Sequence, residues 1–180
     1  MDKCTYYGFK LIVDIATASL AFITAYILAK RYFVERRRDM VYKDYEARCK
    51  MIENESYKNI RSKIEHNDEA LETIFRLVDG SDGDPYTAKL TPEQKTLHED
   101  FDAYINYLEA VALLIRNGNI LTEDTGGVWD YYLARILEWE PSHRYVSYPP
   151  YGWNLFLSEA KKAQERLEQR KRERYRSMPV

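Results

Sequence analysis

The chain has 180 residues, a formal net charge of −2 and two cysteines, Cys4 and Cys49. Two cysteines exclude a disulfide-stapled framework, and the length leaves room for one domain with its own hydrophobic core. The small net charge conceals an uneven distribution, because residues 65–140 carry 17 acidic and five basic side chains. Residues 30–38 and 161–176 are basic, so charge divides the chain into basic, acidic and basic segments.

Leu11–Ala29 is a continuous apolar run that holds one charge, Asp14. As a helix it would be about 28 Å long, close to the ~30 Å thickness of a bilayer's hydrocarbon core. A signal peptide would begin with a basic segment and end at a small-residue cleavage site, and a core helix would carry a polar stripe. We therefore predict a transmembrane helix over residues 11–29, after a short N-terminal segment, residues 1–10.

The basic residues predict the orientation of this helix. Five basic side chains and one acidic side chain lie in residues 30–38, directly after the run, whereas only Lys3 and Lys10 precede it. Basic flanks remain on the cytoplasmic side. The pattern therefore predicts a single-pass protein of the plasma membrane, with its N-terminus outside and its C-terminal domain in the cytoplasm.

Small residues recur every four positions along the predicted membrane helix, at Thr17, Ala21, Ala25 and Ala29. Such spacing lets a second helix approach closely in lipid. Asp14 lies three residues before Thr17 and so points to the same side. We predict a helix–helix interface there, with a polar partner for Asp14. The carboxylate could instead reach water near the outer interface, or belong to an ion pathway.

No proline or glycine occurs between Leu11 and Val78, so the helix is expected to continue beyond the membrane as a stalk. We assign residues 30–66 to a basic juxtamembrane region and this stalk, residues 67–167 to a cytoplasmic helical bundle, and residues 168–180 to a basic tail. Asn67 or Asp68 is expected to cap a new helix after a break at residues 65–68. The apolar face of that helix would be formed by Leu71, Ile74, Phe75 and Val78.

The remaining helices follow from local signals. Thr91, Pro92 and Gln94 form a capping-box pattern that begins a helix ending near Gly118. Shorter and longer helical patterns cover residues 128–138 and 153–176, and the proline-containing segment 141–152 is expected to be irregular. The predicted fold class is all-α, with a single N-terminal transmembrane helix, a helical stalk and a small cytoplasmic helical bundle.

Residues 106–118, NYLEAVALLIRNG, resemble a bacterial family of membrane-anchored helical domains of unknown function. The shared features are an aromatic-x-Glu, an Arg-x-Gly-like turn, a later Trp-Glu and then an Arg, which here are Tyr107, Glu109, Arg116, Gly118, Trp139, Glu140 and Arg144. The resemblance implies a bacterial membrane protein with this architecture and no particular activity. It also favours a structural pair between Glu109, which borders an apolar helix face, and Arg144; backbone donors of the loop after this helix could also serve Glu109.

The sequence shows no catalytic constellation. His66, His98 and His143 lack metal-ligand spacing, and there is no phosphate-binding or nucleophile motif. We therefore expect no catalytic residues, no cofactor and no metal. The basic tail admits three interpretations: a solvated helix end, a segment docked on an acidic surface, or a binder of anionic lipid or nucleic acid. Glu165, Glu168 and Glu173 dilute its charge, which disfavours nucleic acid.

These observations favour a non-enzymatic interaction or accessory subunit of a membrane complex. Its partners would be membrane lipid and either other membrane subunits or a second copy, bound through the small face of the anchor. Two alternatives stay open. One is a membrane-recruited enzyme or effector domain in signalling or phage defence. The other is a binder of anionic lipid or nucleic acid that uses the basic tail.

Overall fold

The computed structural model describes the backbone of residues 3–80, 88–121, 127–148 and 152–177, and the side chains of these residues except 3–14, 16 and 177. The described residues form seven helices and no strand, which confirms the all-α prediction. The helices are α1 (Lys3–Glu53), α2 (Glu55–Glu65), α3 (Glu69–Asp79), α4 (Pro92–Arg116), α5 (Val128–Glu138), α6 (Glu140–Val146) and α7 (Asn154–Ser177).

The chain divides into two units, Met1–Val41 and Tyr42–Val180. The first unit consists of the N-terminal part of α1, and the second contains the rest of α1 and the other six described helices. Within the described part of the chain, no helix combines the length and the apolar character that a membrane crossing requires. The transmembrane helix over residues 11–29 stays a prediction.

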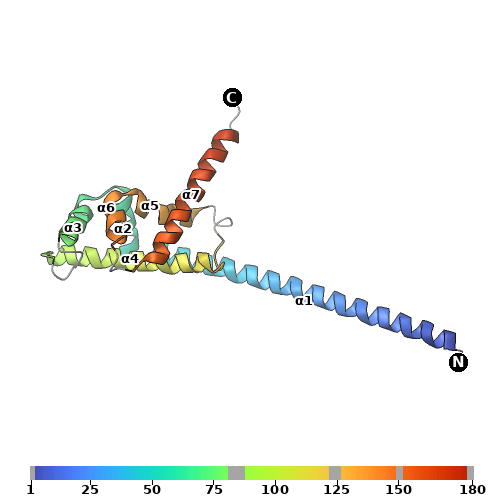
Figure 1. Ribbon diagram of the computed structural model, residues 1–180. Helices are drawn as coiled ribbons and strands as arrows, with labels where there is room; N and C mark the ends of the chain where they lie inside the picture. Colours follow the sequence, from blue (N-terminus) through green and yellow to red (C-terminus); the bar gives the residue numbers. More distant parts are fainter. Residues whose placement is uncertain (1–2, 81–87, 122–126, 149–151, 178–180) are drawn as a thin grey trace. The chain divides into compact units, whose positions relative to one another are not determined.

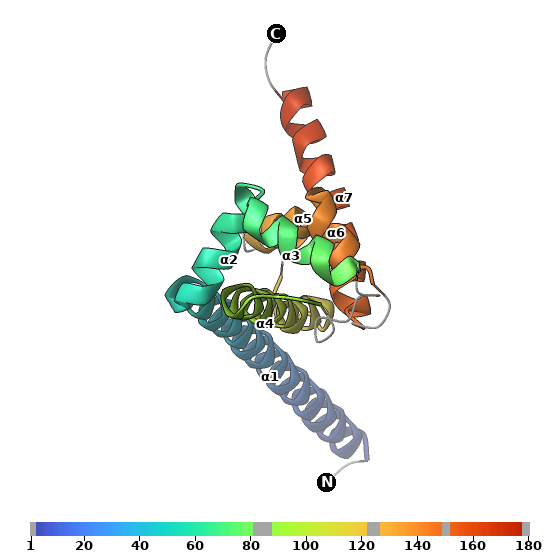
Figure 2. The ribbon, with the colours of Figure 1, turned by 90° about the vertical axis from the view of Figure 1, so that its left-hand side faces the viewer.

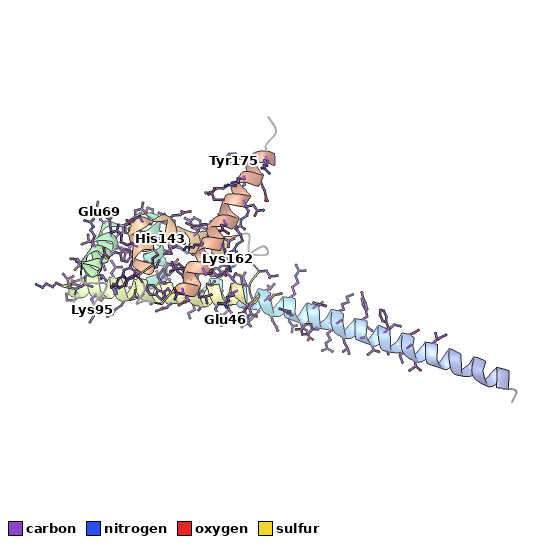
Figure 3. The ribbon with its side chains drawn as sticks, viewed as in Figure 1. Glu46, Glu69, Lys95, His143, Lys162 and Tyr175 are labelled. Atoms are coloured by element: carbon purple, nitrogen blue, oxygen red, sulfur yellow. The ribbon has the colours of Figure 1, made fainter. Side chains whose placement is uncertain are left out.

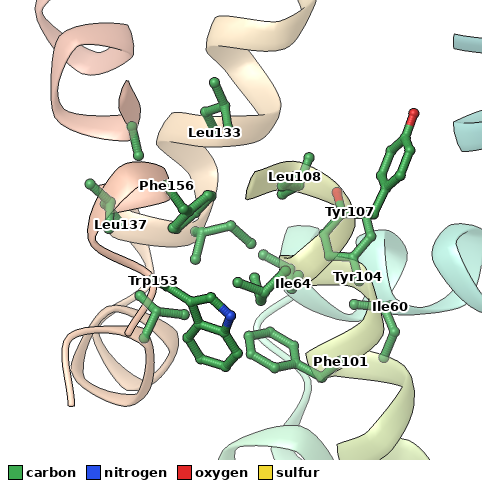
Figure 4. Packing of buried hydrophobic residues seen from close by; sticks show 14 of the residues in the cluster. Ile60, Ile64, Phe101, Tyr104, Tyr107, Leu108, Leu133, Leu137, Trp153 and Phe156 are labelled. Carbon is green, nitrogen blue, oxygen red and sulfur yellow. The ribbon is translucent and has the colours of Figure 1, made fainter. Parts of the chain in front are cut away.

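The second unit is built around α4, which packs against α2, α3 and α7 (Figure 2). Helix α5 packs along α7, and α6 packs against α3 and α5. Aromatic and branched side chains from these helices meet in one core (Figure 4). The largest fully buried side chains are Trp129, Tyr104, Phe101, Phe156, Met51, Ile60, Ile64, Leu71, Ile74, Ile105, Leu108 and Ile120.

Two predicted helix starts are confirmed. The side chain of Asp68 accepts a hydrogen bond from the Leu71 amide at the start of α3. The side chain of Thr91 accepts from the Gln94 amide, and the Gln94 side chain accepts from the Thr91 amide, which completes the capping box of α4. These bonds satisfy amides that the first turn of a helix leaves without backbone partners.

The predicted stalk differs from the structure in two ways. Asn54 ends α1 and caps α2, since its side chain accepts a hydrogen bond from the Tyr57 amide at 3.1 Å. The compact unit begins at Tyr42, so the second half of the predicted stalk belongs to it. Met51, Ile60 and Ile64 are buried there because they supply apolar surface to the same core as α4.

The prediction of an irregular segment over residues 141–152 is wrong for its first part, because residues 140–146 form α6. Pro141 lies in the first turn of α6, where a helix needs no amide from that residue. The buried hydroxyl of Ser142 lies 2.5 Å from the Ile136 carbonyl oxygen and 2.9 Å from that of Trp139. This contact fixes the corner between α5 and α6.

Candidate functional site

The predicted packing face lies on the first unit. Thr17, Ala21, Ala25 and Ala29 are all exposed in this chain and share one side of α1 by their four-residue spacing. The side chain of Asp14 lies outside the described ones. The interface that these residues would form needs a second helix, and so it stays a prediction.

Large apolar side chains surround the same part of α1. Exposed large apolar or aromatic residues there are Ile15, Leu20, Phe22, Ile23, Tyr26, Ile27, Leu28, Tyr32, Phe33 and Val34. A helix that is apolar on all sides is typical of a protein core or a membrane interior. The basic segment follows at once, and within it Arg31 makes an ion pair with Glu35 at 2.9 Å.

The predicted pair of Glu109 and Arg144 is not among the ion pairs of the described residues. Arg144 lies at the surface of α6, where its guanidinium contacts Glu140 at 2.5 Å and Asp79 at 3.7 Å. These carboxylates hold the pKa of Arg144 above its ordinary value. Glu109 is half-buried on α4. Arg144 therefore links α6 to the end of α3.

A pocket of about 250 Å³ lies between α3 and α6. Buried side chains of Phe75, Val78 and Tyr145 form its floor. The ring of Tyr145 stacks on that of Phe75, with centroids 4.8 Å apart and planes at 27°. The pocket is thus a short apolar groove between two helices, built on a rigid aromatic cluster.

Charged side chains surround this groove. The carboxylates are Glu72, Asp79 and Glu140, and the guanidiniums are those of Arg76 and Arg144. Arg76 pairs with Glu72 at 2.8 Å within α3. Because carboxylates outnumber guanidiniums, the rim has an excess of one negative charge.

A buried polar network lies behind the pocket floor. The hydroxyl of Tyr145 lies 2.6 Å from Nε2 of buried His98 and donates to Oδ1 of Asp102 at 2.9 Å. A hydroxyl has one proton, so donation to Asp102 leaves its oxygen to accept from His98. Burial raises the pKa of the Asp102 carboxyl above its ordinary value, and His98 and Tyr145 oppose this shift. The network fixes the ring of Tyr145 at the base of the pocket.

A second buried polar cluster joins α5 to α7. The carboxylate of Asp130 is fully buried and accepts hydrogen bonds from Arg166 at 2.7 and 3.0 Å and from Arg170. Gly127 lies beside it with φ +80°, and a Cβ there would come within 2.6 Å of the Arg170 guanidinium. The basic tail is therefore docked on the acidic part of the chain at its first arginine, Arg170.

Sequence reasoning missed both buried networks. Asp130 has the pattern of an ordinary acidic residue in the first turn of a helix. His98 precedes Glu99 and Asp100, which gives this part of the helix an exposed pattern, whereas the structure buries the His98 side chain. The two arginines at four-residue spacing on α7, Arg166 and Arg170, are a signal that one carboxylate could be held between them. Among the described residues, no group of three or more His, Cys, Asp or Glu side chains is arranged to hold a metal ion.

No known protein family model, no curated protein and no solved structure matches this chain. The resemblance to a bacterial membrane-anchored family therefore stays a prediction.

Proposed function

We propose that this protein is a single-pass, membrane-anchored interaction or accessory subunit without enzymatic activity. The observation that supports this is the exposed apolar surface around α1, from Ile15 to Val34. Keeping that surface in contact with water, rather than burying it, would cost about 25 cal/mol per Å² of apolar area. Membrane lipid and a second membrane helix are the environments that would cover it on all sides. The basic residues that follow support a second unit on the cytoplasmic side, and the resemblance stated above supports a bacterial inner membrane.

Membrane insertion is the first part to test. We expect the full-length protein to stay in the membrane fraction after alkaline carbonate extraction. The variant Ile23→Arg places a charge near the centre of the predicted span, at a cost of up to about 2.5–3.5 kcal/mol, and should be extracted more readily. Val41→Arg is the matched control, because Val41 is also exposed on α1 but lies beyond the span. Extraction of the wild type, or equal behaviour of both variants, would contradict anchoring.

Native mass spectrometry of protein extracted mildly from its own membranes tests the interaction role. A stoichiometric foreign subunit would support an accessory subunit. A pure homo-oligomer would support self-association, and Ala21→Leu with Ala25→Leu should then abolish it if the small face is the contact. A bare monomer would contradict the interaction role.

A second candidate function is a membrane-recruited enzyme or effector domain, and the pocket between α3 and α6 favours it. Two observations weigh against it. The pocket is smaller than the ~300–1,000 Å³ typical of small-molecule sites, and the charged groups on its rim are engaged in ion pairs.

The third candidate, anionic-lipid or nucleic-acid binding by the tail, is weakened because Asp130 already engages Arg170. Steep salt dependence of binding would support it.

A further inference from the structure

The α3–α6 pocket has the size of a single side chain. Its volume of about 250 Å³ is below the usual range for small-molecule sites. The floor of Phe75, Val78 and Tyr145 is apolar and preformed, since the network with His98 and Asp102 holds the tyrosine ring in place. An aromatic side chain with one polar end matches such a floor beneath a charged rim.

The charge around the pocket selects a basic occupant. The rim holds three carboxylates and two guanidiniums. Its three carboxylates come from residues 65–140, a segment in which 17 acidic side chains outnumber five basic ones. An anionic ligand would meet repulsion from this surface, whereas a cationic segment would be attracted to it. The occupant should therefore carry an exposed aromatic residue among basic neighbours.

The end of α7 has these properties. Tyr175 is 75% exposed and stands among Lys171, Arg172, Arg174 and Arg176. Its side chain lies on the last described turns of the helix, which extend beyond the bundle (Figure 3). The two ribbon views agree that these turns point away from α3 and α6 of the same chain (Figures 1 and 2). Only another copy could therefore bring this segment to the pocket.

We propose that the end of α7 from one copy docks in the α3–α6 pocket of a second copy. Tyr175 enters the pocket, and the basic residues around it add further cations to the exposed ion pairs that Glu72, Asp79 and Glu140 make with Arg76 and Arg144. The two surfaces differ, so the contact is heterologous and continues into a ring or a chain of copies. It uses only residues of the unit Tyr42–Val180 and does not depend on the proposed membrane anchor.

The test uses full-length protein in detergent, with two affinity tags on separate copies and with Ala21→Leu and Ala25→Leu in every copy, so that association through the anchor does not hold the copies together. Tyr175→Ala removes the inserted side chain, and Asp79→Lys reverses one charge at the rim. Asp79 is exposed in the last turn of α3, where a lysine suits the helix dipole. The variant also removes the exposed contact of Asp79 with Arg144 at 3.7 Å, and exposed ion pairs contribute little to stability, so circular dichroism should show an unchanged helix content. Each variant alone should lower co-purification of the second copy by about tenfold or more, as expected for a central interface residue.

Mixing the two variants gives the decisive outcome. The Asp79→Lys copy keeps its α7 end, and the Tyr175→Ala copy keeps its pocket, so the mixture should recover a one-to-one complex that grows no further. Matched controls are Tyr42→Ala, another exposed tyrosine, and Glu46→Lys, another exposed carboxylate; both should associate like the wild type. Raising the salt concentration should weaken the wild-type contact.

Association that survives both variants would overturn the inference, and so would a mixture that fails to recover the complex. Neither result bears on the proposed function, which fails only if the protein leaves the membrane fraction or has no partner at all. Self-association through the anchor is recognised because Ala21→Leu abolishes it and Asp79→Lys does not.

Discussion

Replacement of Asp130 by asparagine tests the contact that holds α7 to the second unit. The variant keeps the shape of the side chain and removes its charge. Hydrogen bonds to charged groups contribute about 1.5–3 kcal/mol, and loss of one partner from a buried ion pair costs about 3–5 kcal/mol. The side chains of Arg166 and Arg170 are 32% and 38% exposed, so they can turn towards water and reduce this cost. We expect a loss of about 2–3 kcal/mol in the free energy of unfolding.

Thermal unfolding of the full-length protein, followed by circular dichroism in detergent, measures this loss. At about 2–4 °C per kcal/mol for a unit of this size, the midpoint should fall by roughly 4–12 °C. Glu138→Gln on the same helix is the control, because that carboxylate is exposed and 3.8 Å from its partner Arg135; its effect should stay within about 0.5 kcal/mol. Hydrogen exchange should also quicken in the second half of α7. Equal midpoints for the two variants would refute the assignment of Asp130 as a buried anchor for α7.

Three further predictions concern the second unit. Ile60→Ala should lower the free energy of unfolding by about 2–5 kcal/mol, whereas Ile52→Ala at an exposed position should change it by less than about 0.5 kcal/mol; equal effects in denaturant titrations would exclude Ile60 from the core. Gly127→Ala should lower the free energy of unfolding by about 1–2 kcal/mol or more, because alanine is strained at this positive φ and its Cβ would meet the Arg170 guanidinium. An unchanged midpoint of thermal unfolding would contradict this close approach. The pKa of the Asp102 carboxyl is raised, so the folded state binds this proton more tightly than the unfolded state does. The contribution of Asp102 to the free energy of unfolding therefore falls as pH rises from near 4 through the raised pKa. Asp102→Asn should remove that part of the pH dependence of stability, and parallel stability–pH curves for wild type and variant would contradict it.

The elements that sequence predicted well are those set by local chemistry. A capping residue and the helix face behind it lie within a few positions of each other, so Thr91 and Asp68 mark the starts of α4 and α3 without knowledge of the rest of the fold. The buried face of α3, Leu71 to Val78, follows from helical periodicity alone. These features need no information about which helices meet.

Predictions that depended on distant contacts were incomplete. Asn54 is a common capping residue, but no proline or glycine lies near it, so the sequence predicts a continuous stalk there. The break at Asn54 lets α2 bury Ile60 and Ile64 against the core. Arg144 was matched to Glu109 by resemblance, but the position of α6 places it beside Asp79 instead. The candidate pocket was not predicted for the same reason, since it exists only where α3 and α6 lie together.

Two consecutive residues at the start of α5 connect the two ends of the second unit. Trp129 donates from its ring nitrogen to Asp44 on α1 at 2.7 Å, and Asp130 holds Arg166 and Arg170 on α7. One helical turn thus fixes α7 relative to the bundle end of α1. Arg170 is neutralised by a buried partner, and Lys171 makes an exposed ion pair with Glu168 at 2.9 Å. The docking segment is therefore expected to depend on Asp130 for its position, and Asp130→Asn should weaken the docking of α7 in a second copy even though it leaves Tyr175 in place.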